Sequence, residues 1–66
     1  MTPHEIGEYI ASERRKRGWT RYHLSRLSGV TIRHLHQIED GNIDVRVSTL
    51  QKILKAFNNQ LNFTET

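Results

Sequence analysis

The stretch that decides the fold is Thr20–Gly41, which reads TRYHLSRLSGVTIRHLHQIEDG. It holds two short segments, and each opens on a threonine, Thr20 or Thr31, whose hydroxyl can cap the start of a helix. Ser28-Gly29-Val30 separates the segments, and Gly29 suits a tight turn that needs a positive φ. Helices of only about eight residues are not stable alone. We therefore expect the two helices to pack as one unit.

A longer helix is expected on the N-terminal side of this stretch. Thr2 offers a capping hydroxyl, and Pro3 suits the first helical position. Glu5 stands three residues after the cap, where its carboxylate can accept a hydrogen bond from the backbone of Thr2. Gly18 is typical of the position just after a helix. These signals predict a helix that starts at Pro3 and ends before Gly18.

A fourth helix is expected after a loop at residues 42–47. Ser48 and Gln51 match a second pair of capping residues. Apolar side chains then recur with the spacing of one helix face, and they are Leu50, Ile53, Leu54 and Phe57. Asn58-Asn59 is expected to end this helix.

The pattern changes again at residues 60–64. Leu61 and Phe63 alternate with Asn62 and Thr64, which is the period of a β-strand. A lone strand can neither satisfy its backbone nor bury its apolar face. Two interpretations stay open at this point: the strand pairs with a partner chain, or the tail is a frayed terminus with two apolar residues tucked down.

The size and composition of the chain limit how it can be stabilised. It has 66 residues and no cysteine, so we expect one domain over residues 1–66 with a helical core over 1–57. A domain of this size buries only about 60% of the surface that its unfolded chain exposes. No disulfide can compensate, so close helix packing or a second subunit must.

Positive charge is concentrated in one part of the chain. The net charge is +3, and no acidic residue lies between Glu13 and Glu39. That window holds seven basic residues, which are Arg14, Arg15, Lys16, Arg17, Arg21, Arg26 and Arg33. Such a window is typical of proteins that bind a polyanion, because neutralised phosphates release counterions. A basic surface that is merely solvated is the alternative.

The stretch quoted first resembles the helix-turn-helix of the Cro and cI repressor family, also called the XRE family. The residues that carry the resemblance include the capping Thr20 and Thr31, the Ser28-Gly29-Val30 turn and the Ile38-Glu39-Asp40-Gly41 ending. The resemblance extends over residues 6–57. It implies an all-α, lambda-repressor-like four-helix bundle and a sequence-specific regulator of transcription, a repressor, that binds double-stranded DNA.

In this family the second helix of the motif enters the major groove. The resemblance therefore implies that Ile32, Arg33 and Gln37 contact bases, with His36 as a further candidate. The chemistry suits these roles, because arginine can pair with guanine, glutamine can pair with adenine, and isoleucine can contact the thymine methyl group. For Ile32 the alternative is packing inside the protein, since Ile32, Leu35 and Ile38 are spaced by three.

Further roles follow from the same resemblance. Arg21 stands where the family commonly has a phosphate-binding glutamine, and Thr31 lies at a helix N-terminus, which attracts phosphate. Arg46 could contact the DNA backbone from the loop, or could be simply solvated. Arg14 and Glu39 match positions at which family members often bury an ion pair, which would hold the first helix against the recognition helix.

The C-terminal half of the chain resembles HipB-type antitoxins, in which the four helices are followed by a short strand that pairs with its twin. Here Leu61, Asn62 and Phe63 would form that dimerisation strand. The resemblance implies a homodimer on a palindromic operator. It also raises an alternative function, in which the chain is the antitoxin of a HipBA-like system, neutralises a partner toxin and represses its own operator.

Other classes of protein are not favoured by the sequence. His34 and His36 point about 200° apart on a helix, and no histidine follows another by four residues, so we expect no enzyme, metal or cofactor. The apolar runs are far shorter than the roughly 20 residues that span a bilayer. We expect a cytoplasmic, nucleoid-associated protein of a prokaryote or phage, with no membrane partner.

Overall fold

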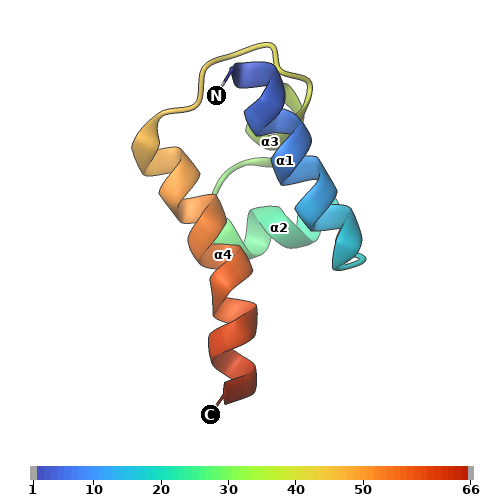
Figure 1. Ribbon diagram of the computed structural model, residues 1–66, viewed down its shortest axis with the longest axis vertical. Coiled ribbons are helices and arrows are strands. Elements are labelled where there is room, and N and C mark those ends of the chain that lie inside the picture. Colours follow the sequence, from blue (N-terminus) through green and yellow to red (C-terminus); the bar gives the residue numbers. More distant parts are fainter. Residues whose placement is uncertain (1, 66) are drawn as a thin grey trace.

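The computed structural model describes the backbone of residues 2–65 and the side chains of residues 2–58. It contains four helices, which are α1 (Pro3–Lys16), α2 (Arg21–Ser28), α3 (Ile32–Glu39) and α4 (Val47–Glu65). The first three gather into one cluster, while α4 begins beside them and leads away (Figure 1). The prediction of an all-α fold is confirmed over the described backbone.

Local hydrogen bonds explain why α1, α2 and α3 begin where they do. The Thr2 hydroxyl accepts from the Glu5 amide at 3.1 Å, and the Glu5 carboxylate accepts from the Thr2 amide at 2.8 Å. The Thr20 hydroxyl accepts from the third residue of α2 at 3.0 Å, and the Thr31 hydroxyl does the same for α3 at 3.1 Å. Gly29, between α2 and α3, has a φ of 80°. The predicted helix starts and turn are confirmed.

One apolar core joins α4 to the helix-turn-helix. Its buried members are Ile10, Leu24, Val30, Leu35, Ile38, Ile53, Ala56 and Phe57. Trp19 lies at the edge of this core and stacks on Phe57, with their ring centroids 5.7 Å apart. Phe57 is only 3% exposed, so α4 helps to hold the motif together as far as this residue.

The crossing of α1 and α3 depends on a glycine. Gly7 is buried in α1, and a Cβ added there would collide with the carbonyl oxygen of Ile38 and lie 2.9 Å from that of Glu39. The two backbones therefore approach more closely than any other residue at position 7 would permit.

The predicted end of the fourth helix and the predicted strand at residues 60–64 are both wrong. α4 starts at Val47, so Ser48 lies inside the helix rather than capping it, and the helix continues to Glu65. The positions of Leu61, Asn62 and Phe63 are thus helical. Asn58-Asn59 does not stop the helix, because asparagine costs less than about 1 kcal/mol in a helix interior and neither proline nor glycine is present. Leu61 also follows Phe57 by four residues, which continues the helical spacing.

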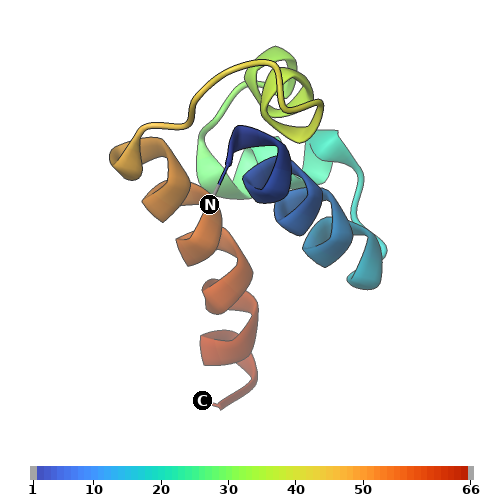
Figure 2. The ribbon, with the colours of Figure 1, turned by 45° about the horizontal axis from the view of Figure 1, so that its top comes forward.

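The distal half of α4 leaves the cluster formed by the other helices. Both views show it extending alone, with no other element beside it (Figures 1 and 2). Within the described part of the chain, no helix is long and apolar enough to cross a membrane.

Candidate nucleic-acid interface

One face of α3 is turned toward solvent and carries the predicted base-contacting residues. Ile32, Arg33 and His36 are exposed, and Gln37 is half-buried. These four positions fall within about 140° of the helix circumference. The opposite face is formed by Leu35 and Ile38, both fully buried.

Ile32 is the residue for which the sequence left an alternative. It is 45% exposed, so it lies on the outer face of α3 rather than in the core that holds Leu35 and Ile38. A β-branched apolar side chain that remains exposed at the start of a helix can contact a thymine methyl group.

Thr31 and Arg46, two of the predicted phosphate contacts, lie in different surroundings. Thr31 is exposed at the N-terminus of α3, where its hydroxyl accepts the capping hydrogen bond from His34 and still has its own proton to donate. Arg46 is exposed in the loop before α4, and its carbonyl accepts from the Leu50 amide at 2.9 Å. The loop after α3 carries the chain across the molecule to the start of α4 (Figure 1), and Arg46 directly precedes that helix.

Arg14 and Glu39 are brought together between α1 and α3. The Arg14 Nε and Nη2 atoms donate to the two carboxylate oxygens of Glu39, at 2.8 and 3.1 Å. The remaining Arg14 Nη1 donates to the carbonyl oxygen of Trp19 at 2.8 Å. The side chain of Glu39 is 2% exposed, so this two-pronged ion pair is buried. It fixes the end of α3 against α1 and against the loop before α2.

Arg21 also pairs with this carboxylate, which the sequence did not predict. Its Nε donates to Glu39 Oε1 at 2.9 Å, and its side chain is about one third exposed. Arg21 is the first residue of α2, so Glu39 connects three helices. Nothing in the spacing of Arg21 and Glu39 indicates the contact, because it depends on how α2 and α3 turn toward each other. Among the described residues, the guanidinium of Arg21 contacts Glu39 through Nε.

The pKa of Glu39 reflects this surrounding. Burial on its own raises the pKa, because loss of water disfavours the charged form of a carboxyl group. The hydrogen bonds and positive charges of Arg14 and Arg21 outweigh burial, so the pKa of Glu39 lies below its ordinary value of 4.5. The carboxylate is therefore ionised at neutral pH and holds both arginines.

The basic window of the sequence is not one continuous basic surface. Arg14 is buried, and Arg17 donates to the Glu13 carboxylate at 2.9 Å while its guanidinium lies 4.5 Å from the centre of the Phe57 ring. Arg26 donates to the Tyr22 hydroxyl at 3.1 Å. Several basic residues thus stabilise the fold itself, and the charge that can face DNA is less than the sequence suggests.

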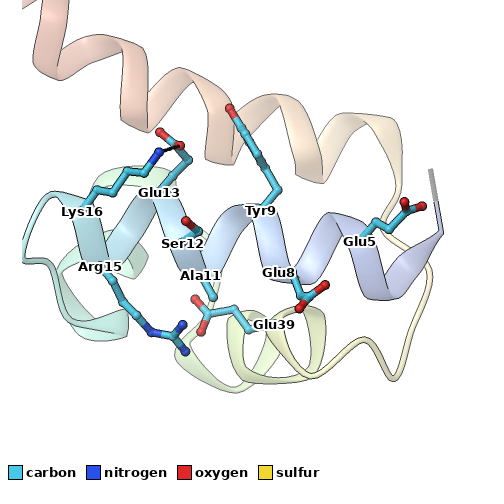
Figure 3. A pocket seen from close by; sticks show the side chains of 9 residues that line it. All are labelled: Glu5, Glu8, Tyr9, Ala11, Ser12, Glu13, Arg15, Lys16 and Glu39. Atoms are coloured by element: carbon cyan, nitrogen blue, oxygen red, sulfur yellow. Dashed lines mark hydrogen bonds and ion pairs between the residues drawn. The ribbon is translucent and has the colours of Figure 1, made fainter.

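A shallow hollow along the outer surface of α1 is lined by acidic residues, unlike the exposed face of α3. Carboxylates dominate its lining, which comprises Glu5, Glu8, Tyr9, Ala11, Ser12, Glu13, Arg15, Lys16 and Glu39 (Figure 3). Lys16 is itself paired with Glu13 at 3.2 Å. Glu13 is also paired with Arg17, and Glu39 is held by Arg14 and Arg21, so the hollow carries less net negative charge than its carboxylates alone would give.

The histidines are dispersed rather than gathered into a metal site. His36 lies 3.2 Å from Asp40, His4 lies 3.4 Å from Glu8, and His23 packs on Trp19. Within residues 2–58, no group of three histidine, cysteine or acidic side chains could hold a metal ion.

Two short helices joined by a glycine turn, with the second presenting a polar face and held by a buried ion pair, define a DNA-binding helix-turn-helix protein. A comparison with protein-family models matches Helix-turn-helix over residues 10–63. The chain belongs to this family, in its Cro/cI (XRE) branch, whose members are DNA-binding regulators of transcription rather than enzymes. Neither the comparison with curated proteins nor that with solved structures gave a match.

Proposed function

We propose that this protein is a sequence-specific transcriptional repressor that binds a palindromic operator in double-stranded DNA as a homodimer. It acts at the nucleoid, in the cytoplasm of a prokaryote, and is encoded by the prokaryote or by a phage. The observation that carries the proposal is the exposed face of α3, which presents Ile32, Arg33, His36 and Gln37 on a helix that a buried ion pair holds in place.

In this proposal α3 lies in the major groove and these residues contact base edges. The guanidinium of Arg33 donates two hydrogen bonds to guanine O6 and N7, and the amide of Gln37 pairs with adenine N6 and N7. Ile32 contacts a thymine methyl group. His36 contacts a base from the same face.

Contacts to phosphate would fix the position of α3 in the groove. The Thr31 hydroxyl and the N-terminus of α3 form one such contact, and the Nη atoms of Arg21 form a second. Because Glu39 already holds the Nε of Arg21 at 2.9 Å, this guanidinium is oriented before DNA arrives. Arg46 would contact the backbone from the start of α4, beyond the motif.

Selection from a pool of random DNA duplexes tests the proposal. The full chain is expected to enrich an inverted repeat whose half-sites are about one helical turn apart. The chain with Arg33→Ala and Gln37→Ala provides the control, and its enriched pool should lose the preference at the corresponding base pairs. A pool that stays random after repeated rounds with the unchanged protein would refute sequence-specific binding.

A second candidate function is that of an antitoxin in a HipBA-like system, which holds a partner toxin and represses its own operator. Large aromatic side chains that remain exposed favour it, namely Tyr9 at 45% and Tyr22 at 57%. Failure to bind duplex DNA of any sequence, with the fold intact, would favour this function over the first.

A further inference from the structure

An apolar groove lies between α1 and the first half of α4. It is lined by Ile6, Tyr9, Leu50 and Leu54, and it has a volume of about 230 Å³. Tyr9 points from α1 toward α4 at one side of it (Figure 3). No described side chain fills this α1–α4 groove, although its lining is almost wholly apolar.

The distal part of α4, residues 58–65, packs against no other element of the chain. It extends beyond the other helices with no element beside it (Figures 1 and 2). Residues 56–64 contain no charged side chain, in a protein where 26% of residues are charged. A helix surface without charges is typical of the centre of an interface rather than of a solvated arm.

A single stripe of α4 connects these two features. Val47 is 71% exposed and lies on the same face as Leu50 and Leu54. Position 61 follows Leu54 by seven residues, as Leu54 follows Val47. Apolar positions separated by three, four and seven residues form the seam along which two helices pair. Val47 and position 61 lie seven residues on either side of Leu54, so in an antiparallel copy centred on Leu54 each would lie opposite the other.

We propose that the α1–α4 groove is the binding site for the distal α4 of a second copy of this chain, through antiparallel pairing of the two α4 helices about Leu54. Position 61 of one copy then faces Val47 of the other, next to Ile6 and Tyr9. The contact is reciprocal about a two-fold axis, so both grooves are filled and no binding surface is left over.

A distal α4 that fills the groove must come from a second copy, because it cannot reach the groove of its own chain. α4 is one continuous helix over Val47–Glu65, and a continuous helix cannot fold its second half back onto its first. This inference deepens the proposed function, since it rests on the homodimer and replaces the expected strand pairing with helix pairing.

Sedimentation of the protein without DNA tests the interface separately from DNA binding. The unchanged chain should sediment as a dimer, and Val47→Glu should sediment as a monomer while its helical circular dichroism is retained. Tyr22→Glu is the matched control, because Tyr22 is similarly exposed but lies on α2; it should remain a dimer. A monomeric unchanged chain would overturn the proposal, as would dissociation of the control to the same degree.

Introducing an opposite charge on each side of the interface tests the antiparallel register. Leu61→Glu alone and Val47→Lys alone should each dissociate the dimer, and the chain that carries both changes should regain it, because glutamate at 61 then faces lysine at 47 of the other copy. A double variant no more dimeric than the single variants would refute the pairing. An unchanged chain that binds DNA as a monomer would refute this interface alone, whereas an unchanged chain that dimerises but binds no DNA would refute the proposed function alone.

Discussion

At the scale of single residues, the central feature of the molecule is the carboxylate of Glu39. It is almost completely buried, and both of its oxygens accept from guanidinium groups. A carboxylate in this position is costly to bury and is stable only because Arg14 and Arg21 accompany it. Glu39 ends the helix that is proposed to contact bases, so its partners decide how that helix is oriented.

Glu39→Ala is expected to lower the free energy of unfolding by about 3 to 5 kcal/mol, because it leaves the buried Arg14 without its partner. Thermal or urea unfolding at neutral pH measures the loss. Glu13→Ala is the control, since hydrogen bonds from Arg17 and Lys16 also lower the pKa of Glu13, but its side chain is 20% exposed against 2% for Glu39. Equal losses in the two variants would show that the Glu39 pair is not buried in the way described.

The contribution of Glu39 to the free energy of unfolding should depend on pH in a definite direction. The pKa of Glu39 is lower when the chain is folded than its ordinary value of 4.5, so the unfolded chain binds the proton more tightly. The stabilisation from Glu39 is therefore complete above that value and declines as the pH falls toward the folded pKa. The difference in unfolding free energy between the unchanged chain and Glu39→Ala should shrink over this acidic range.

At the scale of helices, the sequence predicted the parts that depend on near neighbours. The starts of α1, α2 and α3 follow from threonine and glutamate side chains within three residues of the amides that they bind. The turn at Gly29 follows from the need for a positive φ. Such features are visible in a sequence because the interacting groups are adjacent along the chain.

The features that the sequence did not reveal depend on the approach of distant segments. Arg21 meets Glu39 across 18 positions, and Gly7 meets the carbonyl groups of Ile38 and Glu39 across more than 30. The predicted length of α4 is wrong for a different reason. The alternation at residues 61–64 predicts a strand, the spacing from Leu54 through Phe57 to Leu61 predicts a helix, and both patterns fit the same residues.

Gly7→Ala tests the close crossing of α1 and α3. In an ordinary helix interior, alanine is more stable than glycine by about 1 kcal/mol. Here the added methyl group would collide with the Ile38 carbonyl, so the change should instead destabilise the fold by about 1 to 3 kcal/mol. Ser12→Ala, on the exposed side of the same helix, is the control and should leave the melting temperature nearly unchanged. Stabilisation by Gly7→Ala would mean that the helices are further apart.

At the scale of the whole molecule, the surfaces have separate roles. The outer side of α1 carries carboxylates, whereas the exposed side of α3 carries Arg33 and Gln37. Under the proposals above, DNA binds at the exposed side of α3, and the groove between α1 and α4 takes the α4 helix of a second copy. Two copies related by a two-fold axis present two α3 helices, which matches a palindromic site.

The measurement that tests the central claim most directly is the affinity of the full chain for its selected duplex and for a scrambled duplex of the same composition, with and without Arg33→Ala. Lys52→Ala, which removes one exposed positive charge from α4, is the control for net charge. If α3 contacts bases as proposed, Arg33→Ala will reduce discrimination between the duplexes by about 5- to 150-fold, and Lys52→Ala will preserve it. Equal losses for both duplexes in both variants would contradict base contact by α3.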